Sequence, residues 1–128
     1  MEKGSIINVV AEQLERCKGW IMAALEYGGG THDWEDIVDG VQSGRMQLWP
    51  STKSCIVTEI VVYPKKKLLN IFLAGGELEQ ILDMDDDVKA WAKQQGCTGA
   101  MMSGRKGWER PLKPLGWEVL QVHYQKEI

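Results

Sequence analysis

The sequence has too few metal-binding and disulfide-forming residues to build either kind of framework. Its three cysteines, Cys17, Cys55 and Cys97, are widely spaced without a C-x-x-C pair, and the only histidines are His32 and His123. An odd, scattered set of cysteines supports neither a disulfide scaffold nor a zinc site. We therefore expect no metal cofactor, and we expect the protein to work in a reducing compartment such as the cytoplasm.

The sequence also lacks long apolar runs and an excess of basic residues. No segment approaches the roughly 20 apolar residues of a membrane-spanning helix, and no signal-type apolar core follows the first residues. Eighteen acidic against fifteen basic residues give a net charge of −3, which is not the basic footprint of a general nucleic-acid coat. These absences predict a soluble, cytoplasmic protein without membrane contact, and they argue against nucleic acid as its main partner.

The sequence does contain six tryptophans and a regular alternation of helical and extended hydrophobic patterns. Its 128 residues suit one domain, which we expect to span residues 1–128. Three- and four-residue spacing of apolar residues predicts helices, and clustered β-branched residues predict strands. In chain order we expect helices over 6–27 and between Thr31, as N-cap, and Gly44; strands over 46–49, 55–63 and 68–74; a helix over 78–95; a strand over 97–103; short helical turns over 105–116; and a final strand over 117–125.

Two of these strands indicate the topology of the sheet. The segment 68–74 is apolar on both faces, which is typical of a central strand. A helix separates it from the strand over 97–103, so the two should form a β-α-β crossover and lie parallel. Asp85, Asp86 and Asp87 could continue the intervening helix or begin a second one. The predicted class is an α/β (α+β) fold with a mixed sheet flanked by helices.

The order α-α-β-β-β-α-β-α-β resembles the acetyl-CoA-dependent N-acetyltransferase superfamily, GNAT, without its customary first strand. After their fifth strand, family members carry Asn, a small residue three positions on, Tyr seven on, and Gly-Phe eleven and twelve on. Arg105, Trp108, Leu112, Gly116 and Trp117 fall at these spacings. The resemblance implies a mixed, mostly antiparallel GNAT-like sheet.

Several longer strings are similar to small GNAT-like proteins of phages and prophages. They are SGRMQLWP, VTEIVVYP, LAGGELEQIL, WAKQQGC and GRKGWERPL. This resemblance implies a protein partner, of phage or host origin, and a role in the virion, in assembly or in host interaction.

The resemblance also implies acetyl-CoA as a cofactor, whose pyrophosphate family enzymes hold with a glycine-rich loop at a helix N-terminus. Here the corresponding segment is Ala74-Gly75-Gly76-Glu77, which is shorter, has no leading basic residue and adds a carboxylate. Gly75 and Gly76 are the candidate cofactor-binding residues. The alternative is a simple glycine turn before an acidic first helical turn.

Acid–base chemistry has incomplete support in the sequence. Leu112 stands at the position of the family's tyrosine acid and cannot donate a proton. Tyr63 or Tyr124 could replace it, and Tyr124 is the candidate acid. Glu59 lies between apolar neighbours within a strand and is the candidate base, since burial would raise its pKa; alternatively it faces solvent or Arg105.

The segment from Gly104 to Arg110 concentrates positive charge around a tryptophan. Arg105 and Arg110 could hold a phosphate, and Trp108 could stack on a flat group; alternatively the arginines form ion pairs and Trp108 is core. We expect Trp49 and Trp108 to line one concave surface for a substrate or partner. Three hypotheses follow: a non-catalytic GNAT-like protein, an acyltransferase with an atypical CoA loop, and a nucleic-acid or peptide binder using this segment.

Overall fold

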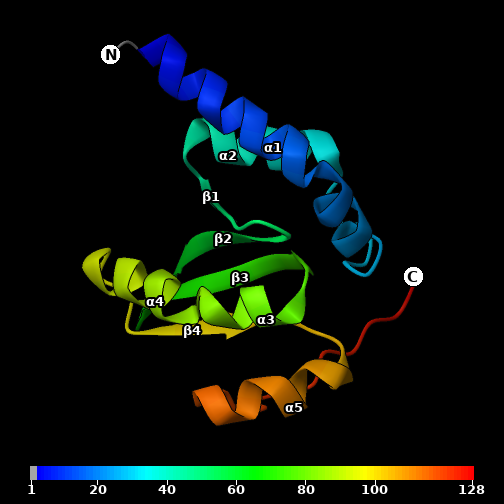
Figure 1. The fold of residues 1–128 in the computed structure, drawn as a ribbon. Coiled ribbons are helices and arrows are strands. Elements are labelled where there is room, and N and C mark those ends of the chain that lie inside the picture. The colour runs from blue at the N-terminus through cyan, green and yellow to red at the C-terminus, as the bar shows by residue number, and fades with distance from the viewer. Residues whose placement is uncertain (1–2) are drawn as a thin grey trace.

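A computed structural model describes residues 3–128, with side chains described from residue 9 onward. It contains a four-stranded sheet and helices on both of its faces (Figure 1). The elements are α1 (Lys3–Leu25), α2 (Trp34–Ser43), β1 (Met46–Pro50), β2 (Ser54–Val62), β3 (Lys67–Gly76), α3 (Leu78–Asp83), α4 (Asp85–Gln94), β4 (Gly99–Met102), the 3-10 helix η1 (Lys106–Trp108), α5 (Glu109–Leu112) and the 3-10 helix η2 (Lys113–Leu115).

The strands lie in the order β1-β2-β3-β4. β1 pairs with β2 and β2 with β3 in antiparallel fashion, whereas β3 and β4 are parallel and are connected through α3 and α4. The predicted mixed, mostly antiparallel sheet is confirmed, as are the inner position of β3 and the crossover to β4. The helix predicted over 78–95 is divided at Met84 into α3 and α4.

Each face of the sheet buries its own apolar cluster. α1 and α2 cover one face, where Cys17, Ile21 and Ile37 pack against Val57 and Leu73. On the opposite face, Val88 and Ala92 of α4 pack against Leu69 of β3. The short α5 lies beyond β4 at the bottom of Figure 1. The sheet is therefore the middle layer of three.

The ends of α2 have clear local causes. Asp33, not the expected Thr31, is the N-cap: its carboxylate accepts from the Asp36 amide, and the Asp36 carboxylate accepts from the Asp33 amide. This reciprocal capping box satisfies two amide groups that a helix start leaves unpaired, so it is favoured over a hydroxyl two residues earlier. Gly44 ends the helix at a φ of 84°, a conformation that glycine adopts without strain.

The predicted final strand over 117–125 is wrong. After η2 the described chain forms no further helix or strand, although Leu120, Val122 and Tyr124 alternate with polar residues as a strand would. Gly116, at a φ of 89°, turns the chain, and the indole N–H of Trp117 donates to Asp85 of α4 at 3.4 Å. The segment therefore leaves from α4 and does not pair with the outer edge of β4. None of the described helices is long and apolar enough to cross a membrane.

Candidate functional site

The candidate site lies where the two parallel strands separate. β3 and β4 pair from Leu68 and Gly99 as far as Ile71 and Met102, after which β4 ends and β3 continues to Gly76. The register of β2 against β3 shifts at Val57, so one extra residue of β3 bulges at this level. Ligands of open sheets with parallel strands bind at such carboxyl ends, and bulges are frequent beside active sites.

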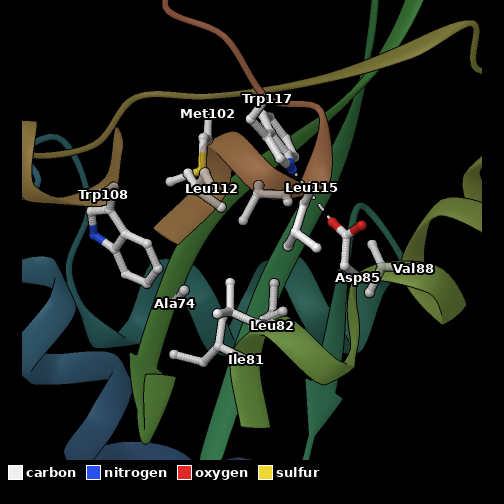
Figure 2. A pocket seen from close by; sticks show the side chains of 12 residues that line it. Ala74, Ile81, Leu82, Asp85, Val88, Met102, Trp108, Leu112, Leu115 and Trp117 are labelled. Carbon is white, nitrogen blue, oxygen red and sulfur yellow. Dashed lines mark hydrogen bonds between the residues drawn. The ribbon is translucent and has the colours of Figure 1, made fainter. Parts of the chain in front are cut away.

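On the α3 side, side chains fill the space next to this separation. Trp108, Leu112 and Leu115 point from the α5 region toward Ile81 and Leu82 of α3 (Figure 2). The cavity that remains among them is about 30 Å³. Small-molecule sites span about 300–1,000 Å³, at least ten times this volume.

Gly75 and Gly76, the candidate cofactor-binding residues, both lie against backbone. A Cβ on Gly75 would be 2.7 Å from the carbonyl oxygen of Trp20 in α1, and one on Gly76 would be 2.5 Å from the Cα of Ser54 in β2. Gly76 also has a φ of 103°. Close packing alone accounts for both glycines, whether or not a ligand binds beside them.

The start of α3 presents a carboxylate and a partly used set of amides. The Glu77 amide donates to the carbonyl of Lys53 at 3.0 Å, and the Glu77 carboxylate lies 3.9 Å from the Lys53 ammonium, with both side chains largely exposed. α3 has six residues, and no side chain caps its N-terminus. A negative charge beside this turn disfavours a phosphate there.

Glu59, the candidate base, is half-buried on β2. Its Oε2 accepts a hydrogen bond from Nδ2 of Asn70 on β3 at 2.8 Å. The alternative prediction was that Glu59 faces solvent or Arg105. In the structure its hydrogen-bond partner is the side-chain amide of Asn70, not Arg105. Asn70 lies two residues before the bulge of β3, so its partner Glu59 is near the point where the pairing of β3 with β4 ends. Asn70 and Gly75 are five residues apart on β3, which is about 16 Å at 3.3 Å per residue. Glu59 is therefore far from the glycine turn.

The candidate acid and the alternative tyrosine lie apart from each other. Tyr124 is in the extended C-terminal segment and is 89% exposed. The Tyr63 hydroxyl donates to the sulfur of Met101 at 3.8 Å.

The arginines of the basic segment point away from the cavity that Trp108 lines. The Arg105 guanidinium lies 4.0 Å from the ring centroid of Tyr27, at the end of α1, in a cation–π contact. Arg110 is exposed on α5. Among the described residues no ion pair involves either arginine, so the ion-pair alternative has no support, while Trp108 packs inward as the alternative expected.

Trp49 and Trp108 are not brought to one surface. The indole N–H of Trp49 donates to the Thr58 hydroxyl at 3.0 Å, and its ring meets Trp91 of α4 edge-on at 5.6 Å. Trp49 is therefore part of the packing between β1 and α4, and it is absent from the residues lining the cavity beside Trp108.

Two features on the α1 side have no counterpart in the sequence patterns. Cys17 and Cys55 belong to one buried cluster, and burial, followed by the neighbouring Cys17 thiol, raises the pKa of Cys55 to about 12. The His32 ring packs against Phe72 at the bulge in a tilted arrangement, with 4.5 Å between ring centroids. Both contacts join residues about 40 positions apart, and no local pattern reports such pairing. No group of three or more acidic, histidine or cysteine side chains among the described residues could hold a metal ion.

Comparison with solved structures identifies the fold. A probable acetyltransferase is 11% identical with a TM-score of 0.67 and covers 91% of this chain and 93% of its own. A Trypanosoma brucei acetyltransferase is 9% identical with a TM-score of 0.64, covering 95% and 94%. Glucosamine-6-phosphate N-acetyltransferase from Arabidopsis thaliana is 10% identical with a TM-score of 0.57, covering 77% and 80%.

No family model and no curated protein matches the sequence. At these identities the likeness concerns the fold alone. The chain therefore has the fold of the GNAT acetyltransferases.

Proposed function

We propose that this chain is a GNAT-fold protein that has lost acyl transfer and acts through contact with another protein. One observation carries the proposal: the side chains of α5 and its flanking turns fill the space between α3 and α5, leaving a cavity of about 30 Å³. A cofactor of the size of acetyl-CoA needs a groove at least ten times larger.

The residues at the expected cofactor loop also do not fit acetyl-CoA. At this turn the Glu77 amide already donates to the carbonyl oxygen of Lys53. The Glu77 carboxylate adds negative charge where a pyrophosphate would need positive charge. Leu112, at the position of the family's proton donor, contributes an apolar side chain to the filled space.

The proposed setting is the cytoplasm of a host cell or a phage particle, and the proposed partner is a phage or host protein. The support is the resemblance of five sequence strings to small phage and prophage proteins. If the chain is coproduced with the phage that encodes it, a virion or assembly role predicts that it sediments with particles or their precursors.

Isothermal titration of the purified chain with acetyl-CoA and with CoA tests the proposal. We expect no binding at millimolar ligand, and no CoA release when primary amines are added. Native mass spectrometry of freshly purified protein should find no CoA bound. An active acetyltransferase treated in parallel controls for ligand quality. Micromolar binding with detectable turnover would overturn the proposal.

A second candidate function is acetyl-CoA-dependent N-acetyltransfer with an atypical cofactor loop. The bulge on β3 and the separation of β3 from β4 favour it, and the solved structures of similar fold include acetyltransferases. It requires the α5 region to move away from α3. If turnover is found, Glu59→Gln should abolish it and leave the unfolding midpoint unchanged; full activity in this variant would remove Glu59 from the mechanism.

A further inference from the structure

An open apolar groove runs beside β1, the outermost strand on one side of the sheet. It lies between β1 and the helices α1 and α2, and its volume is about 320 Å³. Its walls are mostly aliphatic: Val9, Val10, Val41, Met46, Leu48 and Pro50. No described strand pairs with the outer edge of β1, so unpaired backbone groups lie directly beside the groove.

An edge strand beside an apolar groove suits one kind of occupant. An extended segment can add a strand to the edge, its main chain pairing with β1 while alternate side chains enter the groove. Because successive side chains of a strand point to opposite faces, the segment needs apolar residues at every second position and polar residues between them.

The C-terminal segment after Trp117 has this pattern and is unused. Leu120, Val122 and Tyr124 occupy alternate positions and are 87%, 66% and 89% exposed. The positions between them carry Gln121 and His123. A single monomer thus exposes both an apolar strand-type segment and an apolar groove with an open strand edge.

We propose that the segment 118–128 of one copy pairs with the outer edge of β1 of a second copy, with Leu120, Val122 and Tyr124 in the groove. A twofold dimer made in this way uses both segments and both grooves. The occupant is a second copy because the groove and the matching segment are present in the same chain. The inference does not depend on the absence of acyl transfer.

Pairing within one chain is disfavoured by the position of the segment. Trp117 is held on α4 through Asp85, and the segment then runs toward the loop between α1 and α2, where Gln125 lies near Gly29. In Figure 1 the C-terminus lies at the right edge, beside the turn after α1, whereas β1 is left of centre. A second copy can present its segment to β1 without that detour.

The area available is sufficient for a specific dimer. Burying one aliphatic side chain removes on the order of 100 Å² from water, so three side chains and the matching groove wall bury about 600 Å² per contact. Two contacts bury about 1,200 Å², above the roughly 1,000 Å² that a specific interface needs.

The first test measures the dimer dissociation constant of the full chain by sedimentation equilibrium. A tail variant, Leu120→Ser with Val122→Ser and Tyr124→Ser, should weaken the dimer at least about tenfold. The matched control, Gln121→Ser with His123→Ser and Gln125→Ser, should leave it unchanged. All six side chains are exposed in the monomer, so the fold is preserved, as circular dichroism will verify.

A groove variant provides the complementary change. Val9→Lys places a charge at the groove wall on a side chain that is 56% exposed, and Met22→Lys is its control elsewhere on the same helix. Val9→Lys should weaken the dimer to a similar extent, and Met22→Lys should not.

Mixing the tail variant with Val9→Lys shows directly whether the segment of one chain enters the groove of another. The Val9→Lys chain keeps its tail and the tail variant keeps its groove, so a heterodimer regains one of the two contacts, whereas the homodimer of each variant has both contacts damaged. The heterodimer should therefore be tighter than either homodimer. The proposal is overturned by a monomeric wild-type chain, by a dimer insensitive to both changes, or by a heterodimer no tighter than the two homodimers. A monomer whose segment 118–128 is protected from hydrogen exchange would show pairing within the chain and would equally refute it.

Discussion

Replacing Gly76 by alanine tests whether the glycines after β3 serve packing or ligand binding. Gly76 pairs with Ser54 across the β2–β3 ladder. An added Cβ would lie 2.5 Å from the Cα of Ser54 and closer still to the carbonyl oxygen of Lys53. Real Cβ atoms do not approach backbone so closely, so β2 or the turn into α3 must shift. The φ of 103° at this position adds a penalty of its own.

These two terms set the magnitude. A left-handed backbone costs an ordinary residue about 1–2 kcal/mol relative to glycine, and overpacking costs about 1–3 kcal/mol. The sum, roughly 2–5 kcal/mol, is a large part of the 5–15 kcal/mol that stabilises a typical domain. With a urea m-value of about 2 kcal/mol/M, the unfolding midpoint should fall by about 1–2.5 M in a titration followed by circular dichroism.

Gly107→Ala is the matched control, since nothing lies within 4 Å of the position of its Cβ and its φ is not positive. Its midpoint should stay within a few tenths of 1 M of the wild-type value. Gly75→Ala should also destabilise the fold, because its Cβ would meet the carbonyl oxygen of Trp20. An unchanged midpoint for Gly76→Ala, together with lost CoA binding, would refute the packing argument and assign the glycine to a ligand.

Three further predictions concern thiols, helix propensity and pH. In the native protein a water-soluble disulfide reagent at pH 8 should react quickly only with Cys97. Cys17 and Cys55 are buried, and burial raises the pKa of both thiols. Three thiols that react equally fast would contradict this. Gly19→Ala should raise the free energy of unfolding by up to about 1 kcal/mol, since Gly19 lies within α1 with nothing within 4 Å of its Cβ position; a lower urea midpoint would refute it. Hydrogen bonds from Asp33 hold the pKa of Asp36 below its ordinary 3.8. The ionised Asp36 carboxylate therefore stabilises the fold above pH 3.8, and this contribution is lost as the pH falls below 3.8. In urea titrations Asp36→Asn should lose less stability than the wild type between pH 5 and pH 2.5.

The parts of the fold that depend on local patterns could be predicted from the sequence. The spacing of apolar residues located α1 and α2, and the two-sided apolar run of β3 placed that strand inside the sheet. The prediction of a final strand was wrong because alternating apolar residues are typical of a strand but do not show whether a neighbouring strand is available to pair with it. Whether residues 117–125 pair is decided by the turn at Gly116 and the Trp117–Asp85 contact, which no local pattern contains.

The candidate site was less predictable because its roles depend on contacts between distant segments. From the sequence, Gly75 and Gly76 could belong to a ligand loop or to a simple glycine turn before an acidic first helical turn. Their neighbours in α1 and β2 are more than twenty residues away, and only the structure identifies them. The Asn70 partner of Glu59 and the Tyr27 partner of Arg105 likewise follow from strand register and from the end of α1.

Packing can account for the motif spacing from Arg105 to Trp117, as the proposed loss of acyl transfer requires. Trp108, Leu112 and Trp117 sit at motif positions, and all three point into the small cavity between α3 and α5. A side chain at such a position contributes to stability through the area it buries, whether or not its neighbour is a cofactor. If no ligand occupies the groove, apolar side chains that fill it are favoured, because an empty apolar cavity is costly. The retained spacing is therefore accounted for by packing, since Trp108 in place of the family's small residue and Leu112 in place of its tyrosine each add an apolar side chain to this space.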